Sequence, residues 1–318
     1  LIHKKNNYNT YKRMLRIINK INKISYLEII LFVLLASLIY VVLFKNNKEG
    51  FIQHKKNFVK HTDEDIYDKF YVNVYDKILY NTDKNNFEIS YIFPKPTKNS
   101  FVLDIGCGTG HHIKSINDLN IRSIGIDNSR EMIEKAKKNY PTLKFKQCNT
   151  MNTMEFPEHT FSHILCLYFT IYYIKDKRQF LENCYQWLKP NGVLIIHLVN
   201  VNKFDPIVPN ATSFDDKIER PVKSIIEFDK FKYISKFQQD RGVDINNINI
   251  KEPNVIFKEE FKFNDKHTRI NEHKLYMSSQ ESILSTAKEI GFILKSYTEI
   301  NIDSYKYNYL YTLQKPSK

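Results

Sequence analysis

The stretch from Phe101 to Gly110, with the sequence FVLDIGCGTG, constrains the fold more than any other part of the chain. Its apolar residues surround a single acid, Asp104, and predict a short buried strand. The glycines at 106, 108 and 110 allow a sharp turn into a helix that begins near His111. Backbone amides at such a helix N-terminus attract polar or anionic ligands. The stretch therefore predicts a strand–turn–helix unit that binds a ligand.

Two glycine-rich patterns compete for this turn. A dinucleotide-binding loop has the pattern G-x-G-x-x-G, which would require a glycine at position 111, where this chain has His111. The observed spacing is G-x-G-x-G, with Asp104 two positions before the first glycine. The pattern therefore disfavours a nicotinamide-dependent oxidoreductase, which remains only as an alternative function.

A second signal follows about 20 residues later, where a nucleotide-binding βαβ unit places an acid. The segment Arg122–Asp127 predicts a strand that ends in Asp127, whose carboxylate can accept hydrogen bonds from both hydroxyls of a ribose. Taken alone, Asp127 would be equally well explained as a turn or helix-capping residue. Asn128 and Ser129 then precede a predicted helix, Arg130–Asn139, with one apolar face.

Together these motifs resemble those of the class I S-adenosylmethionine-dependent methyltransferases, over roughly residues 60–318. The resemblance implies an α/β fold with a doubly wound, Rossmann-like, mostly parallel seven-stranded sheet and an antiparallel insert. It also implies S-adenosyl-L-methionine as the cofactor. Asn149 stands where the family usually has an Asp that accepts a hydrogen bond from the adenine amino group. The residues implied to bind the cofactor are Asp104, Gly106, Cys107, Gly108, Gly110, Asp127, Asn128, Asn149, Thr150 and Tyr168.

The methyl acceptor has a weaker signature. The Asn/Asp-Pro-Pro-aromatic motif of nucleic-acid amino methyltransferases is absent, and Cys166–Tyr173 stands in its place. The predicted catalytic candidates are Tyr168, His197 and His273, and the predicted substrate-binding residues are Tyr71, Tyr75, Tyr172, Asn200 and Arg269. Arg269 would suit a carboxylate-bearing substrate. Core packing is the alternative for each tyrosine, and a hydrogen-bonded structural role is the alternative for each histidine.

The N-terminal part has a different character from the rest of the chain. The formal net charge is +13, and the cations between Lys4 and Lys23 all precede the first carboxylate, Glu28. Such a segment could bind nucleic acid or anionic lipid, or flank a membrane helix. Leu27–Phe44 is almost wholly apolar over about 18 residues, which is the short end of what spans a bilayer. We therefore predict a single-pass transmembrane helix.

These observations predict a basic flank at 1–24, a transmembrane anchor at 25–45 and a linker at 46–60. A methyltransferase domain at 61–318 follows, with a substrate-covering insert at 201–278. Within it, 63–80 and 87–93 are expected to be helical, and 225–237, 255–263 and 268–276 to be extended. The four cysteines have neither disulfide nor zinc spacing, which favours free thiols, no bound metal and a catalytic domain facing the cytosol.

The sequence therefore predicts a membrane-anchored, S-adenosylmethionine-dependent methyltransferase. We expect its acceptor to be a small or lipid-like molecule rather than nucleic acid, because the basic residues cluster beside the anchor. A protein acceptor stays open. A catalytically inactive scaffold with the same fold is a second alternative, since Asn149 departs from the family pattern.

Overall fold

The computed structural model describes residues 58–95, 99–204, 206, 208, 209, 211, 223–240, 242–302 and 305–317, and a few residues nearer the N-terminus. The chain divides into two compact units, Leu1–Asn57 and Phe58–Lys318. The residues described in the first unit are helical: Tyr26, Ile30, Leu31, Val33, Leu34, Leu35 and Ser37. No helix within the described part is long and apolar enough to cross a membrane. Most of the predicted anchor at 25–45 lies outside the described residues.

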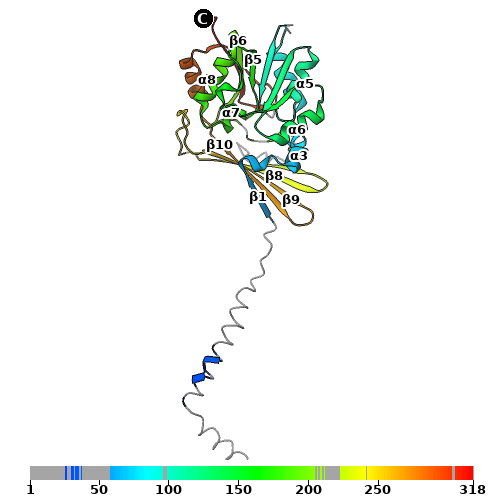
Figure 1. Ribbon diagram of the computed structural model, residues 1–318, viewed down its shortest axis with the longest axis vertical. Helices are drawn as coiled ribbons and strands as arrows, with labels where there is room; N and C mark the ends of the chain where they lie inside the picture. Colours follow the sequence, from blue (N-terminus) through cyan, green and yellow to red (C-terminus); the bar gives the residue numbers. More distant parts are fainter. Residues whose placement is uncertain are drawn as a thin grey trace, which may run out of the picture. The chain divides into compact units, whose positions relative to one another are not determined.

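The second unit is built on a mixed seven-stranded sheet with the order β11-β12-β6-β5-β2-β3-β4 (Figure 1). Its strands are β2 (Phe101–Ile105), β3 (Arg122–Asp127), β4 (Phe145–Gln147), β5 (Phe161–Cys166), β6 (Leu188–Val199), β11 (Ile293–Glu299) and β12 (Asn308–Gln314). Strands β2 to β6 pair in parallel, and β11 and β12 extend the sheet antiparallel. The Rossmann-like prediction for this region is confirmed.

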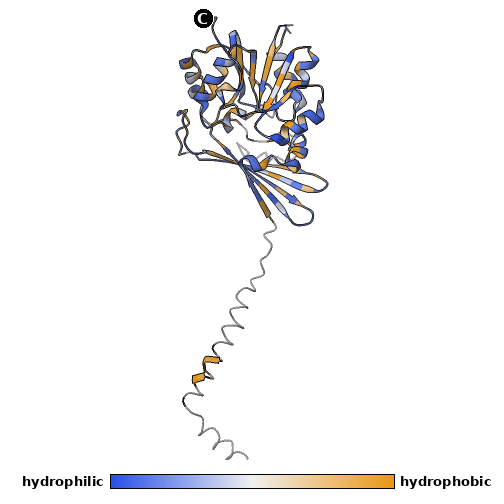
Figure 2. Ribbon diagram, in the orientation of Figure 1, coloured by the Kyte–Doolittle hydropathy of each residue, from blue (hydrophilic) through white to orange (hydrophobic). Residues whose placement is uncertain are grey.

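Helices cover both faces of this sheet, because side chains along a buried strand alternate between the two sides. Leu103 and Ile105 pack toward one face with α8 (Lys177–Trp187) and α9 (Gln280–Ile290). Val102 packs toward the other face with α4 (Thr82–Ile92) and α5 (His111–Asp118). Figure 1 shows α8 and α5 on opposite sides of the strands, and Figure 2 shows apolar residues concentrated in the sheet between them.

A second sheet of five strands has the order β1-β10-β9-β8-β7. Its strands are β1 (Phe58–Thr62), β7 (Lys223–Glu227), β8 (Phe231–Gln239), β9 (Val255–Phe263) and β10 (Thr268–Leu275). Four of them pair antiparallel, as predicted for the insert, whereas β1 pairs in parallel with β10. The second unit consequently starts at Phe58, because part of the segment predicted as a linker, 46–60, is a strand of this sheet.

Helix α3 (Lys69–Leu79) packs on the five-stranded sheet through Tyr71, Ile78, Tyr233 and Phe261. The helix predicted at 63–80 is interrupted: η1 (Asp63–Ile66) comes first, and Asp68 then starts α3 by accepting a hydrogen bond from the Tyr71 N–H. The extended segment predicted at 225–237 is likewise two strands. A tight turn at Phe228 separates them, where its N–H donates to the Phe231 carbonyl at 2.9 Å.

Candidate active site

The glycine turn between β2 and α5 has the backbone conformation that its sequence requires. Gly106, Gly108 and Gly110 all have positive φ values, of 71°, 51° and 93°. A Cβ at Gly106 would lie 2.5 Å from Thr170 Oγ1, and one at Gly110 would lie 2.7 Å from the ring of Phe145. At Gly108, in contrast, a Cβ would have only Tyr75 within 4 Å, at 3.9 Å. The backbone of Gly108 is therefore open to a ligand on the side that a side chain would fill.

Asp127, at the end of β3, lies against this turn. Its Oδ2 accepts a hydrogen bond from the Gly108 N–H at 3.0 Å, and its Oδ1 accepts one from the Ser129 N–H at 2.9 Å. Burial raises the pKa of the Asp127 carboxyl, although these two backbone N–H groups lower it in part. Each carboxylate oxygen can accept a further hydrogen bond, so Asp127 can serve the turn and a ligand together.

A cavity of about 950 Å³ opens over the glycine turn and Asp127. This volume lies at the upper end of the range for small-molecule sites, so it can hold a nucleoside and a second molecule. The ends of β3 and β4, the helix α3, the short helix α7 (Thr170–Tyr173) and the strand β10 all contribute to its wall. The cavity therefore lies between the two sheets, at the carboxyl ends of the parallel strands.

Past the end of β4, the lining is polar and close to Asp127. Gln147, Cys148, Asn149, Thr150 and Met151 all line the cavity there. Asn149 Oδ1 accepts a hydrogen bond from the Met151 N–H at 2.9 Å, which orients the side-chain amide. The second lone pair of that oxygen remains available to an amino group of a ligand.

The opposite wall is rich in tyrosine. Tyr67, Tyr71, Tyr75 and Tyr173 line it with His273. Ring centroids of Tyr67 and Tyr71 lie 5.7 Å apart, and those of Tyr71 and Tyr75 lie 5.9 Å apart. These edge-to-face contacts pack the rings against one another and fix their positions in the wall.

Eleven of the residues predicted from the sequence line this cavity. They are Tyr71, Tyr75, Gly106, Cys107, Gly108, Asp127, Asn128, Asn149, Thr150, Tyr168 and His273. The structure places six others away from the lining: Asp104, Gly110, Tyr172, His197, Asn200 and Arg269. Asp104 is buried next to the turn, and Gly110 begins α5.

The side chains of Tyr172 and His197 hold the core together. The Val199 N–H donates to the Tyr172 hydroxyl at 2.9 Å, so the adjacent Tyr173 faces the cavity instead. His197 contacts the Tyr168 carbonyl at 2.7 Å and Asn308 Oδ1 at 3.0 Å, and burial lowers the pKa of His197 to about 4. A neutral, doubly hydrogen-bonded imidazole away from the lining has a structural role.

Arg269 and Asn200 are also committed elsewhere. The Arg269 guanidinium is buried and donates to Asp68 Oδ2 at 2.6 Å, to the Ile66 carbonyl at 2.8 Å and to Asn271 Oδ1 at 2.8 Å. It therefore joins β10 to the start of α3 and does not reach a substrate carboxylate. Asn200 lines a separate hollow of about 160 Å³ near the start of α9.

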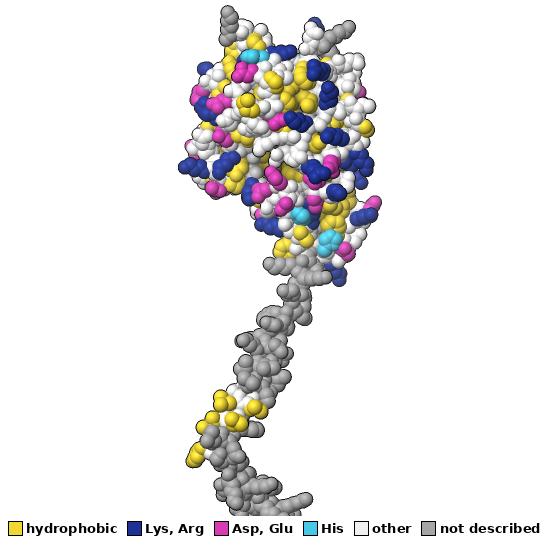
Figure 3. All heavy atoms as spheres, in the orientation of Figure 1, with side chains coloured by type: hydrophobic (Ala, Val, Ile, Leu, Met, Phe, Trp, Pro, Cys, Tyr) yellow, Lys and Arg dark blue, Asp and Glu magenta, His cyan; other side chains and the backbone are white. Residues whose placement is uncertain are grey.

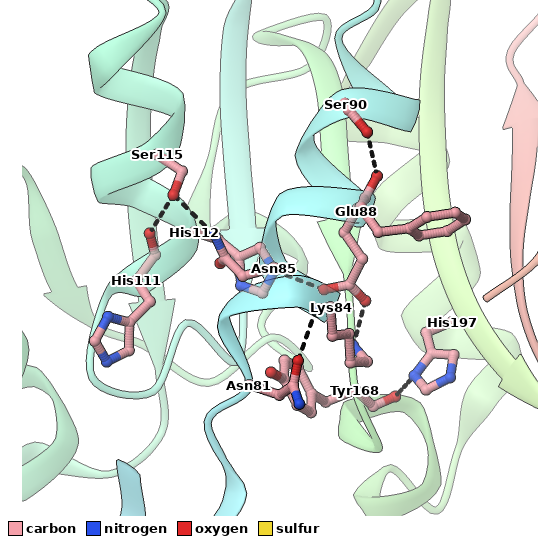
Figure 4. A network of polar contacts seen from close by, with 11 residues as sticks. Asn81, Lys84, Asn85, Glu88, Ser90, His111, His112, Ser115, Tyr168 and His197 are labelled. Carbon is pink, nitrogen blue, oxygen red and sulfur yellow. Dashed lines mark hydrogen bonds and ion pairs between the residues drawn. The ribbon is translucent and has the colours of Figure 1, made fainter. Parts of the chain in front are cut away.

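A buried polar network supports the turn from the side of α4 (Figure 4). Lys84 and Glu88 are completely buried and form an ion pair across one turn of this helix. Glu88 Oε2 also lies 2.8 Å from His112 Nε2, on the first turn of α5. Lys84 Nζ lies 3.5 Å from the ring centroid of Tyr168, whose main chain holds His197. The network thereby links α4, the helix after the glycine turn, and the cavity residue Tyr168.

Sequence reasoning missed several functional candidates, namely Tyr67, Tyr173, Glu259 and the Lys84–Glu88 pair. For Tyr67 and Glu259, the spacing of neighbouring residues in the sequence gave a signal that could have found them. Tyr67, Tyr71 and Tyr75 recur at helical spacing. Glu259 lies at even spacing from the buried residues Val255 and Phe261 and therefore shares their face of one strand. A carboxylate on the inward face of a strand indicates buried partners, which here come from α3 and from the neighbouring strands β8 and β10.

Comparison with known proteins agrees with this geometry. Residues 102–192, which include the glycine turn and Asp127, match the family described as a methyltransferase domain. The ubiquinone biosynthesis O-methyltransferase of Bradyrhizobium diazoefficiens is 31% identical over 105 residues, which cover 32% of this chain and 40% of that protein. The chain thus spans less than half the length of that relative.

Two other proteins match over more of the chain. The phosphoethanolamine N-methyltransferase of Plasmodium falciparum is 26% identical over 200 residues, covering 62% of this chain and 69% of that protein. The crystal structure of an S-adenosylmethionine-dependent methyltransferase from Clostridium acetobutylicum superposes with a TM-score of 0.57. That alignment covers 78% of this chain and 98% of the other at 16% identity, and it shows a shared fold.

Proposed function

We propose that this chain, which belongs to the class I S-adenosylmethionine-dependent methyltransferases through its methyltransferase domain, transfers a methyl group from that donor to a small-molecule acceptor. The observation that carries the proposal is the position of Asp127. Its carboxylate lies on the glycine turn, at the wall of a cavity of about 950 Å³. The open side of Gly108 provides the close backbone approach that a nucleoside needs.

When bound, S-adenosylmethionine supplies a methyl group on a positively charged sulfur, and displacement at that methyl group removes the charge. The chain's own residues align the reactants and exclude water. Asp127 would accept hydrogen bonds from the ribose hydroxyls, and Asn149 would accept one from the adenine amino group. The tyrosines of the opposite wall would enclose the acceptor in a largely apolar space.

The lining favours a small or lipid-like acceptor. Phe204, Phe237, Phe257 and Leu275 add apolar surface to the tyrosine wall. On the face that Figure 3 shows, Lys and Arg side chains are interspersed with Asp and Glu, unlike the continuous basic stripe of a nucleic-acid-binding surface. The names of the two relatives denote O- and N-methyl transfer, so both acceptor atoms are represented among similar proteins.

Donor binding by the full chain tests the proposal. We expect calorimetry to detect binding of S-adenosylmethionine and of its demethylated product, and Asp127→Ala to weaken both by about 100-fold. This estimate assumes the loss of two hydrogen bonds to a charged group, each contributing about 1.5 kcal/mol or more. The matched control is Asp118→Ala, which removes an exposed acid paired with Lys114 and should bind normally. Wild-type affinity in Asp127→Ala, or binding of NADH in place of the sulfonium, would contradict the proposal.

We also propose that residues 25–45 anchor the chain in a membrane, with the catalytic unit on the cytosolic side. The apolar run Leu27–Phe44 supports the anchor. Cations lie on both sides of this run, before it from Lys4 to Lys23 and after it from Lys45 to Lys60, so the charge bias across it is small. The four cysteines are free and buried in the second unit, in keeping with a reducing compartment. The full chain should float with phosphatidylcholine vesicles, and a chain that begins at Phe58 should remain in the dense fraction. Equal flotation of both chains would refute the anchor.

A further inference from the structure

A buried carboxylate behind the tyrosine wall has an unusual number of partners. Glu259, on β9, is completely buried. Its Oε1 accepts hydrogen bonds from the hydroxyls of Tyr71 at 3.0 Å and Tyr233 at 2.9 Å. Its Oε2 accepts one from Asn271 Nδ2 at 3.0 Å and lies 2.7 Å from His273 Nε2. Burial alone would raise the pKa of Glu259, but His273, Asn271 and Tyr233 together hold it below its ordinary value. Glu259 is therefore a fixed anion.

This anion fixes the tautomer of His273. Because Nε2 faces the Glu259 carboxylate, a neutral imidazole carries its proton on Nε2 and donates it to Oε2. Nδ1 is then an acceptor, and it lies 2.9 Å from the hydroxyl of Tyr173. The Tyr173 hydroxyl accordingly donates to Nδ1. Its oxygen also interacts with the Tyr67 side chain, which leaves it one further lone pair. Tyr173 and His273 both line the cavity, so a continuous path runs from the cavity through Tyr173 and His273 to Glu259.

The path lies close to the expected position of the donor. Tyr173 ends the short helix α7, and Thr170 at the start of the same helix packs against Gly106. On the other side, Tyr75 lies over Gly108, and the ring centroids of Tyr71 and His273 lie 5.9 Å apart. The Tyr173 side chain is 40% exposed, and it lines the cavity. The acceptor end of the path thus adjoins the glycine turn.

We propose that Tyr173, His273 and Glu259 form a proton relay for a hydroxyl-bearing acceptor, which makes the reaction an O-methylation. This inference rests on the proposed methyltransferase function. A hydroxyl needs a base to become a good nucleophile, whereas a neutral amine already has an available lone pair. A buried carboxylate–imidazole pair that ends in a phenol at the cavity wall supplies such a base.

The acceptor oxygen forms a bond to the methyl carbon, and the carbon–sulfur bond breaks with its electron pair remaining on sulfur. The acceptor's proton moves to the Tyr173 oxygen while the proton of Tyr173 moves to His273 Nδ1. The resulting imidazolium is stabilised by the Glu259 carboxylate, which acts as a positioning residue and stays ionised. Return of that proton to solvent restores the relay after product release.

The activity test uses the full chain, labelled S-adenosylmethionine and two acceptor probes, 3,4-dihydroxybenzoate for hydroxyls and phosphoethanolamine for amines. We expect methylation of the hydroxyl probe, with kcat lowered about 100-fold or more in Tyr173→Phe and His273→Gln and donor affinity kept within about threefold. Glu259→Gln should lower kcat less, by about tenfold. Tyr297→Phe, at an exposed position on β11, is the matched control and should keep wild-type kcat.

A second measurement does not need the natural acceptor. Nitrogen NMR of histidine-labelled protein, with the demethylated donor product bound, should show His273 with its proton on Nε2 and Nδ1 unprotonated. Tyr173→Phe should shift the Nδ1 resonance. A proton on Nδ1, methylation of the amine probe alone, or wild-type kcat in the Tyr173 and His273 variants would overturn the relay. If neither probe is methylated, the NMR result decides. Failure of the methyltransferase proposal would appear separately, as absent donor binding.

Discussion

Buried acids in this protein differ in charge because their partners differ. Glu88 faces Lys84 and His112, and although burial opposes it, these partners lower the pKa of Glu88 to about 2. Asp104 is equally buried, but its Oδ2 has no hydrogen-bond partner among the described residues. Burial, with smaller contributions from Glu88 and Asp127, raises the pKa of Asp104 to about 7, against the opposing effect of His112. Asp104 should therefore titrate near neutral pH, whereas Glu88 remains ionised.

This difference predicts a pH-dependent effect of Asp104→Asn. A carboxyl whose pKa is raised by folding stabilises the fold while it is protonated, and that contribution is lost as the pH rises from about 4 through about 7. The neutral variant avoids the loss. In donor-free protein, its free energy of unfolding should exceed that of the wild type by up to about 4 kcal/mol at about pH 8, and by less than about 1 kcal/mol near pH 4. Urea unfolding across this range measures the difference, and a pH-independent difference would contradict the prediction.

At the scale of elements, α4 is fixed to the rest of the catalytic unit by an ion pair inside its buried face. Burial lowers the pKa of Lys84, and the adjacent Glu88 counteracts this effect. The pair reaches α5 through His112 and the cavity through Tyr168 (Figure 4). A buried pair of this kind contributes little net stability, but removal of one partner leaves an unpaired charge. Its main consequence is therefore the fixed placement of α4 beside the glycine turn.

Lys84→Met should consequently destabilise the protein by about 3–5 kcal/mol, because Glu88 would lose its main partner. The double variant Lys84→Met/Glu88→Leu should recover most of that loss, because both buried charges are gone. Urea unfolding of the two single variants and the double variant gives the coupling energy. Additive effects would show that the two side chains act independently and would refute this account of α4.

At the scale of the whole catalytic unit, its first strand completes the sheet that the later strands β7 to β10 form. The strand β1 comes from the N-terminal end of the unit, yet it pairs with β10, about 200 residues later. The residues after β1 reinforce this junction. The Ile66 side chain is buried, and the Ile66 carbonyl and Asp68 both accept hydrogen bonds from Arg269. The cavity wall formed by α3 and β10 therefore depends on a segment outside the region that matches the methyltransferase family, 102–192.

Truncation tests this dependence. A chain that begins at Phe58 should unfold cooperatively and bind the donor within about threefold of the full chain, because the unit Phe58–Lys318 is complete. A chain that begins at Lys69 lacks β1, the Ile66 side chain and the partners of Arg269. It should be less stable by about 3 kcal/mol or more, since Arg269 would be buried without Asp68 and the Ile66 carbonyl and would keep only Asn271 as a partner. Equal thermal unfolding of the two chains would contradict the prediction.

The predictable part of the structure was local. The glycine turn, the strand that ends in Asp127 and the helix Arg130–Asn139 each follow from residues adjacent in sequence, and the structure has all three. The segment predicted as extended at 225–237 is strand on both sides of a turn at Phe228, and the turn was not predicted because the hydrophobic alternation continues through it. The strand β1 begins at Phe58, within the segment predicted as a linker, because an edge strand of this kind is recognised only through its partner β10.

The sequence by itself determined the wall of the cavity that the glycine turn and Asp127 form, because these residues belong to one short βαβ unit whose geometry is set by local backbone chemistry. Tertiary structure alone decided the opposite wall, which is rich in tyrosine. Tyr173, His273 and Glu259 come from three elements distant along the chain, and their hydrogen bonds depend on strand register and helix orientation. Tyr172 and Tyr173 show most clearly what the sequence could not predict. Both lie on α7, but the orientation of this helix directs the Tyr172 side chain into the core and the Tyr173 side chain into the cavity wall.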